Sequence, residues 1–198
     1  MNIYPLFSSP VVEIQVKEDL SQLNKIKTNY EFVESNSTGS YNSFTTINRN
    51  ILDDFPEETE ILLKYFNSFK DDVLKFDSTM FRLTTSWATK TKSNGYSQFH
   101  NHTNSVFSGV LYYDYISSGN IEFTTTDNHT IQLNSPSELN LLNMRSFYLR
   151  PKKNSLLFFP SHLLHRISKN KSEYDRYSLA FNLFPTGSII AGDSSITF

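Results

Sequence analysis

Residues 100–113, HNHTNSVFSGVLYY, join a pair of histidines to a β-rich run that continues to Tyr115. The aromatic residues from Phe107 onward favour a strand. His100 and His102 stand two positions apart, and successive side chains of a strand point to opposite faces. The spacing therefore predicts that both imidazole rings point the same way, close enough to bind one metal ion.

The stretch FPSHLLH, residues 159–165, supplies the expected third ligand, His165. Because the chain has no cysteine, imidazole and carboxylate are the strong ligands left for a transition metal, and imidazole suits iron, zinc, copper and nickel. We therefore expect a mononuclear metal site made by His100, His102 and His165. The alternative is that these are unrelated surface or hydrogen-bonded histidines, since short motifs also match by chance.

A second polar pair lies in RYSLAFN, residues 176–182. As a strand, this segment points Arg176 and Ser178 to one face and Tyr177 and Leu179 to the other. An arginine can bind a carboxylate through two parallel hydrogen bonds, and a neighbouring hydroxyl adds another donor. The pair therefore predicts a pocket for a dicarboxylate co-substrate. For Arg176 taken alone, a surface salt bridge is the simpler alternative.

Together these motifs resemble the Fe(II)- and 2-oxoglutarate-dependent oxygenases, most closely a branch of that family found in marine bacteria and their phages. The resemblance covers most of the chain, and the combination of motifs is specific. It rests on IYPLFSSPV (residues 3–11), SWA (86–88), NGY (94–96), HNHTNSVFSGVLYY (100–113), LFFPS (157–161) and RYSLAFN (176–182).

The chain departs from the better-known members of this family at the second ligand. Those members carry His-x-Asp or His-x-Glu, whereas His102 stands here in place of the carboxylate. Two arrangements are open: a three-histidine site, or a site in which two histidines bind and a more distant carboxylate or water completes the shell. Asp114 is a weak candidate for that carboxylate. An all-neutral ligand set leaves the metal more positive, which favours anionic co-ligands such as 2-oxoglutarate.

The resemblance implies a mainly β fold, a double-stranded β-helix (jelly roll) with flanking helices. It also implies an enzyme, an Fe(II)- and 2-oxoglutarate-dependent dioxygenase that hydroxylates an unidentified substrate and releases succinate and CO2. The implied cofactors are Fe(II), held by His100, His102 and His165, and 2-oxoglutarate as co-substrate. The implied partners are 2-oxoglutarate, O2 and the unidentified substrate.

Binding of the co-substrate is expected around Arg176. The resemblance implies that Arg176 and Ser178 hold the far carboxylate of 2-oxoglutarate. Tyr112, on the strand after the metal motif, could donate a hydrogen bond to the co-substrate, although a large aromatic residue is more often part of the core. Asn104 and Ser105 could hydrogen-bond the co-substrate or simply close a turn.

Three further residues are expected to lie outside the metal site and the co-substrate pocket. His162 stands three positions before His165, and the family match favours His165 as the ligand. His129 lies in a predicted turn and is expected to be exposed to solvent. Trp87 is expected in the core rather than in the pocket, as is usual for large aromatic residues.

Length and composition limit the number of domains and the classes of protein to which the chain could belong. The 198 residues suffice for one domain, residues 1–198, with a barrel core at approximately 80–185. A net charge of −2 argues against a protein that wraps nucleic acid. The absence of cysteine gives no sign of an oxidising compartment, and neither a signal peptide nor a membrane span is apparent. We expect a soluble, cytoplasmic protein, in the host cytoplasm if a phage encodes it; a homodimer stays open.

The pattern of apolar residues divides the chain near Met80. Before it, residues 18–27 and 56–73 are expected to form helices, the second of which should pack outside a sheet. The Asn-, Ser- and Thr-rich residues 34–50 are expected to form a loop, either a cover over the site or a plain surface loop. After Met80, turn signals such as Asn94-Gly95 separate short runs typical of a sandwich or barrel. The expected strands are residues 81–88, 107–115, 120–125, 130–133, 146–150, 155–159 and 176–184.

Two other classes of protein are compatible with parts of this pattern. A cupin-type metalloprotein shares the barrel and a His-x-His motif, but the glutamate expected shortly after the pair is missing and Arg176 and Ser178 have no role in it. A noncatalytic β-sandwich interaction protein of phage type would use its histidines for packing. Metal content separates the last class from the others, and dependence on 2-oxoglutarate separates the oxygenase from the cupin.

Overall fold

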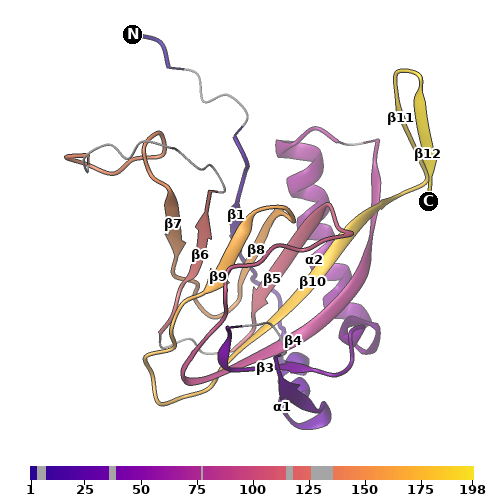
Figure 1. Ribbon diagram of the computed structural model, residues 1–198. Coiled ribbons are helices and arrows are strands. Elements are labelled where there is room, and N and C mark those ends of the chain that lie inside the picture. The colour runs from indigo at the N-terminus through magenta and orange to yellow at the C-terminus, as the bar shows by residue number, and fades with distance from the viewer. Residues whose placement is uncertain (4–7, 36–38, 77, 115–117, 126–135) are drawn as a thin grey trace.

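Two antiparallel β-sheets and a layer of helices make up the body of the protein (Figure 1). A seven-stranded sheet, in the order β1-β8-β5-β10-β4-β3-β2, carries helices on one face and a three-stranded sheet, β7-β6-β9, on the other. The expected mainly β fold with flanking helices is confirmed. The computed structural model describes residues 1–3, 8–35, 39–76, 78–114, 118–125 and 136–198.

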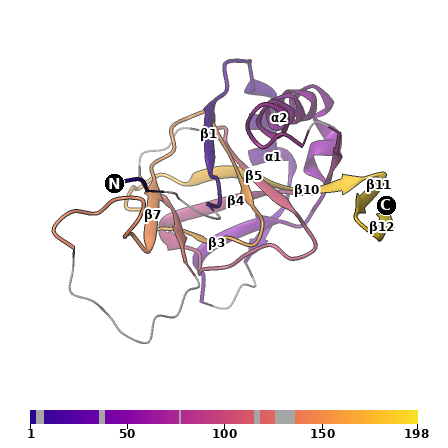
Figure 2. The ribbon, with the colours of Figure 1, turned by 90° about the horizontal axis from the view of Figure 1, so that it is seen from above.

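The strands of the large sheet are β1 (Val12–Gln15), β2 (Phe32–Glu34), β3 (Tyr41–Thr46), β4 (Met80–Tyr96), β5 (Phe107–Tyr112), β8 (Ser155–Pro160) and β10 (Arg176–Thr186). Those of the small sheet are β6 (Ile121–Thr124), β7 (Ser146–Leu149) and β9 (Leu164–Ile167). A C-terminal hairpin of β11 (Ser188–Ala191) and β12 (Ser194–Thr197) projects away from the body in both views (Figures 1 and 2).

Alternation along β10 assigns each of its side chains to one of two cores. Leu179 and Phe181 enter the apolar cluster beneath the helices, whereas Ala180 enters the cluster between the two sheets. Arg176 and Ser178 share the face of Ala180, as two-residue periodicity requires. The central strand therefore holds its polar side chains toward the space between the sheets, where the small sheet can approach them.

The helix α2 (Pro56–Ser68) confirms the better-supported helix prediction and continues into a π-helical turn, η3 (Phe69–Val73). Pro56 occupies the first turn together with two glutamates, a favourable start because proline lacks only a donor that is unpaired there anyway. Phe66 is fully buried and its ring meets those of Phe81, Phe107 and Phe158 at centroid distances of 5.2–5.5 Å. The helix thus covers the outer face of the large sheet (Figure 2).

The first predicted helix exists in shorter and tighter form. Residues 18–27 were expected to be helical, and the structure has a 3-10 helix, η1 (Ser21–Lys25), followed by a single turn, α1 (Ile26–Asn29). Leu23 and Ile26, three residues apart, are both fully buried. This three-residue spacing suits the three residues per turn of a 3-10 helix.

The expected loop at residues 34–50 is wrong over most of its described length. Glu34 ends β2, Tyr41–Thr46 form β3, and a 3-10 turn, η2 (Ile51–Asp54), begins just after the end of this range. Ser43 and Thr46 are both buried, on opposite faces of β3, which pairs along β4. Composition suggested a loop, but pairing with a long neighbouring strand outweighs weak local preference.

β4 passes through the expected turn at Asn94-Gly95. Asn94 adopts a left-handed conformation, with φ of 61°, and the two residues exchange backbone hydrogen bonds with Asn170 at 2.8 Å each. These bonds hold the irregular segment against the connection between β9 and β10, and the strand ends only at Tyr96. The expected strand at 130–133 lies outside the described residues. Within the described ranges, no helix combines the length and apolar character needed to cross a bilayer.

Candidate metal centre

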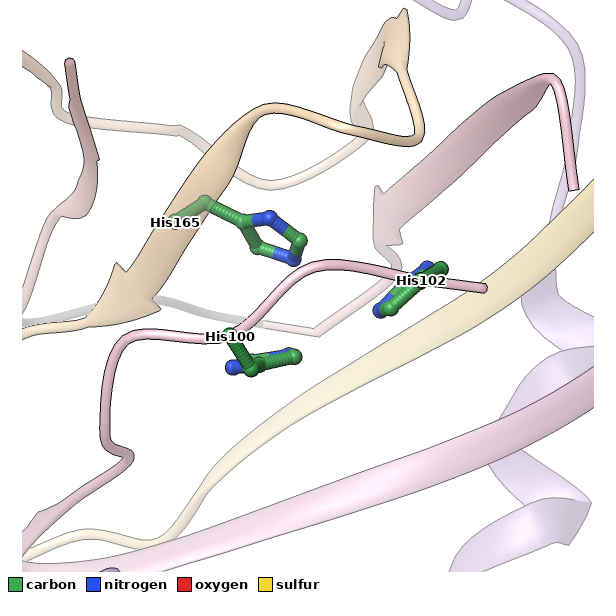
Figure 3. Close-up of side chains that lie close together, drawn as sticks. All are labelled: His100, His102 and His165. Carbon is green, nitrogen blue, oxygen red and sulfur yellow. The ribbon is translucent and has the colours of Figure 1, made fainter. Parts of the chain in front are cut away.

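The rings of His100, His102 and His165 converge in the space between the sheets (Figure 3). His165 lies on β9, whereas the other two lie in the segment between β4 and β5. His100 and His165 exchange backbone hydrogen bonds of 3.0 and 2.9 Å, which places their rings on the same side with centroids 4.4 Å apart. Potential ligand atoms of all three residues lie within 4.8 Å of one another. Among the described residues, no carboxylate joins this group.

The His100–His102 pair is not part of a regular strand, contrary to expectation. Only His100 forms a bridge, and His102 is fixed separately because its backbone N–H donates to the Ser161 carbonyl at 2.9 Å. The two rings nevertheless lie on the same side, with centroids 5.4 Å apart. Side chains two positions apart therefore point the same way in this segment even though it does not form a continuous strand.

Each ring has its Nδ1 atom occupied by an oxygen of the protein. Nδ1 of His100 and of His165 lie 2.9 Å from the carbonyl oxygens of Gln98 and Leu163, and Nδ1 of His102 lies 2.8 Å from the Asn182 amide oxygen. A nitrogen that faces a carbonyl or amide oxygen carries the proton. All three Nε2 atoms therefore keep their lone pairs, which is the form that binds a metal.

Burial keeps two of these rings neutral. Burial, together with the proximity of His100, lowers the pKa of His165 to about 3 and that of His102 to about 4. Metal binding requires neutral imidazole, so these two rings need lose no proton near neutral pH. The donor set fits a borderline metal such as Fe(II). Asp114, the weak candidate for a carboxylate ligand, forms a salt bridge with Lys27 instead, at 2.7 Å.

Arg176, Ser178 and Tyr112 lie on the neighbouring strands β10 and β5, and Ser178 reaches the cavity of the triad. Ser178 lines the same cavity as the three histidines, and Arg176 stands two residues earlier on that face of β10. Arg176 is 3% exposed and Tyr112 is fully buried, so the surface salt bridge considered for Arg176 is wrong. Nη1 of Arg176 and the Tyr112 hydroxyl are both enclosed without a hydrogen-bond partner.

Two unsatisfied donors beside a metal-type site fit an anionic ligand. Burial raises the pKa of Tyr112 to about 12, partly offset by Arg176, so the phenol keeps its proton. Burial lowers the pKa of Arg176, but a guanidinium stays charged in proteins. An unpaired buried cation is costly, and a carboxylate is the group that would satisfy both donors.

The remaining predicted residues are less central. Asn104 is exposed in a left-handed turn, with φ of 57°, and does not line the cavity; Ser105 donates to the carbonyl of Phe107 at 2.8 Å. Trp87 lines the cavity, with its ring centroid 5.3 Å from that of His102, so its expected place in the core alone is wrong. His162 is exposed and outside the triad. The predicted exposure of His129 concerns a position outside the described residues.

Residues 85–182 match the model of a family described as "Putative 2OG-Fe(II) oxygenase". These residues belong to the 2OG-Fe(II) oxygenase family. They include the three histidines of the triad and the two side chains with unsatisfied donors, Arg176 and Tyr112. The predicted family is confirmed, and so are its cofactors, Fe(II) and 2-oxoglutarate; the marine bacterial and phage branch stays a prediction. No curated protein matches the chain.

Solved structures of several enzymes share the fold. HygX from Streptomyces hygroscopicus, with nickel, 2-oxoglutarate and hygromycin B bound, has a TM-score of 0.62 at 12% identity, over 90% of this chain and 84% of its own. SnoN, an epimerase from nogalamycin biosynthesis, has a TM-score of 0.64 at 10% identity, over 94% of this chain and 83% of its own. A Pseudomonas putida prolyl-4-hydroxylase has a TM-score of 0.58 at 10% identity, over 88% of this chain and 93% of its own. The predicted jelly roll is confirmed.

Two residues of the oxygenase domain take part in the site although the motifs assign them no role. Asn182 meets His102, and the two-residue period that pairs Arg176 with Ser178 could have placed Asn182 on the same face. Gly119 leaves room for the guanidinium of Arg176, because a Cβ atom at residue 119 would lie 2.2 Å from Nη1 of the arginine. Nothing local in the sequence indicates this second contact.

Proposed function

We propose that the protein is an Fe(II)- and 2-oxoglutarate-dependent dioxygenase that hydroxylates a small polar substrate. The observation that carries the proposal is the convergence of three free Nε2 lone pairs beside the unpaired donors of Arg176 and Tyr112. Neither a packing role for the histidines nor a cupin-type site accounts for a buried arginine that has no anionic partner within the described chain.

In the proposed reaction, O2 and 2-oxoglutarate are consumed together with the substrate. With Fe(II) bound, the site would supply the redox chemistry by which O2 and 2-oxoglutarate convert a substrate C–H into C–OH, with succinate and CO2 as the other products. His100, His102 and His165 would hold the ion in a cavity of about 310 Å³. Three neutral ligands leave its two positive charges uncompensated, which suits a dianionic co-substrate.

The co-substrate would be oriented by the polar face of β10. Arg176 would hold the far carboxylate of 2-oxoglutarate through its planar guanidinium, with Ser178 and Tyr112 donating hydrogen bonds. Because these donors are already buried and nearly fixed, little reorganisation is needed when the co-substrate enters. The 2-oxo acid end would then face the histidines.

The lining of the cavity favours a polar substrate. Hydroxyl groups of Ser43, Thr45 and Thr89 line it together with the charged side chains of Glu34 and Arg49. Such groups hydrogen-bond a polar molecule and would be left unpaired by a purely apolar one. Hydroxylation is the reaction we propose, while an epimerase and a carbocyclase are among the proteins of similar fold, so other reactions also occur on this scaffold.

Anaerobic titration tests the proposal directly. Addition of Fe(II) and then 2-oxoglutarate should produce the weak visible charge-transfer band of a chelated 2-oxo acid, and admission of O2 should yield succinate. His165→Ala should abolish stoichiometric Fe(II) binding and both signals. Metal binding without any effect of 2-oxoglutarate would favour the cupin-type alternative. Failure of the wild-type protein to bind metal would favour the noncatalytic β-sandwich.

A further inference from the structure

His102 is oriented by a side chain from a distant strand, unlike the other two histidines. Nδ1 of His100 and of His165 each contact the carbonyl two residues earlier in the chain. Nδ1 of His102 instead lies 2.8 Å from Oδ1 of Asn182, which is 80 residues away on β10, and 2.8 Å from Oγ of Ser108. The first two rings are thus positioned by local backbone, whereas the third depends on tertiary structure.

The Asn182 amide points its oxygen toward His102 and its nitrogen toward β4. Its Nδ2 donates to the Thr85 hydroxyl at 3.0 Å, and its Oδ1 accepts from Ser108 at 2.9 Å. With the amide oxygen facing His102, the ring presents a proton on Nδ1. The opposite amide orientation would present N–H to the ring and force the proton onto Nε2, where it would block the metal.

A short chain of hydroxyl groups supports this contact. Ser108 and Ser161 are fully buried with Oγ atoms 2.8 Å apart, and Ser161 donates to Ser105 at 2.9 Å. On the other side, β4 contains a bulge opposite Asn182, where the pairing with β10 shifts by one residue. Bulges re-aim side chains locally, so Asn182 sits where the sheet departs from regular pairing in order to reach the ring.

We propose that Asn182 is a positioning residue that makes His102 the third metal ligand, by fixing both the direction of its ring and the position of its proton. This inference rests on the proposed metal site. It gives the side chain at residue 102, which replaces the family's usual carboxylate, a dedicated partner. Hydrogen-bond partners of this kind typically change metal affinity by about ten- to a hundred-fold when they are removed.

The test compares Asn182→Leu with Asn182→Asp. Leucine is close in size but cannot accept a hydrogen bond, so it should weaken Fe(II) and Co(II) binding by about ten- to a hundred-fold. Aspartate still accepts from Nδ1 and should restore wild-type or tighter affinity. Asn170→Ala is the control, because Asn170 is likewise an asparagine with several side-chain hydrogen bonds but contacts Thr91 and Tyr174 rather than the triad. It should leave metal affinity unchanged.

A second readout needs no metal. In the metal-free protein, ¹H–¹⁵N correlation spectra of the imidazole rings should show His102 with its proton on Nδ1. In Asn182→Leu the same ring should populate both tautomers, while His100 and His165 keep theirs. A wild-type His102 protonated on Nε2 would overturn the inference, even in a protein that binds metal.

The His102→Gln background separates a specific role from general damage. If Asn182 acts through His102, Asn182→Leu should cause no further loss of metal affinity once His102 is replaced. A loss of the same size in both backgrounds would overturn the inference, as would wild-type affinity in Asn182→Leu. If the wild-type protein itself binds no metal, the proposed function fails first, and the tautomer measurement still decides the contact.

Discussion

At the residue scale, Arg176 gives the strongest support for the proposed anion site. Its guanidinium is enclosed, and its Nη1 lacks a partner within the described structure. Burying a charge without a counterion costs free energy, and that cost falls when a carboxylate enters. In the proposed function, the binding energy of the co-substrate would therefore include relief of an unfavourable state that already exists in the free protein.

We predict that Arg176→Ala weakens 2-oxoglutarate binding about ten- to a hundred-fold while Fe(II) affinity stays nearly constant. A charge-assisted contact in a sheltered site contributes about 1.5–3 kcal/mol. Lysine should rescue only partly, because it keeps the charge and loses the planar fork. Anaerobic titrations of both ligands measure this. Unchanged 2-oxoglutarate affinity in Arg176→Ala would assign the carboxylate to another residue.

A substitution at Gly119 tests the same proposed role of Arg176 without replacing the arginine. A Cβ atom there would lie 2.2 Å from Nη1 of Arg176, so Gly119→Ala should displace the guanidinium and weaken 2-oxoglutarate binding without changing Fe(II) affinity. Gly119 also has φ of +91°, so backbone strain must be separated from the clash. Gly187→Ala is the matched control, with φ of +79° and no atom within 4 Å of the new Cβ. Equal 2-oxoglutarate affinities in the two variants would contradict the prediction.

At the element scale, helix α2 and the small sheet act on opposite faces of the large sheet and have different roles. α2 buries aromatic side chains that stabilise the sheet, whereas β9 brings His165 to the histidine pair. This division follows from alternation along β5, β8 and β10, which directs one set of side chains to each core. Stability and metal binding should therefore respond to different substitutions.

Phe66→Ala tests this separation. Removing a fully buried phenylalanine that contacts three other rings should lower the free energy of unfolding by about 3–5 kcal/mol. Phe76→Ala, at a position that is 51% exposed, should change it by only about 0.5 kcal/mol. Urea denaturation gives both values. Fe(II) affinity of folded Phe66→Ala should match wild type; a large loss would mean that the two faces are coupled.

At the scale of the whole molecule, the histidine triad links stability to pH. His102 and His165 have pKa values lowered by burial to about 4 and about 3, whereas both would titrate near about 6.5 in the unfolded chain. Below about pH 6.5 the unfolded chain binds more protons than the folded one, so acid favours unfolding. This stabilisation is complete above about pH 6.5 and is lost as the pH falls toward the folded values.

We predict that the metal-free protein loses stability with a slope of up to about 1.4 kcal/mol per pH unit for each of these two histidines. Urea denaturation at about pH 7, 5.5 and 4.5 measures the slope. The double variant His102→Gln, His165→Gln removes both groups and should show a shallower dependence. Identical slopes in the two proteins would show that other groups dominate acid unfolding.

The sequence by itself determined the features that repeat over a few residues. Two-residue alternation placed Arg176 with Ser178 and directed His100 and His102 to one side, while proline, glutamates and apolar spacing located helix α2. These patterns are readable because backbone stereochemistry fixes the direction of each side chain relative to its near neighbours. The family and its jelly roll were accessible in the same way, through motifs that each span a few residues.

Only the tertiary structure decided which of these segments meet. It turned the polar residues 41–46 into a strand against β4, placed Gly119 against Arg176, and brought Asn182 to His102 across 80 residues. None of these contacts has a local signature, because strand partners are selected by the sum of long-range packing and hydrogen bonding over the whole sheet rather than by the preference of any single segment.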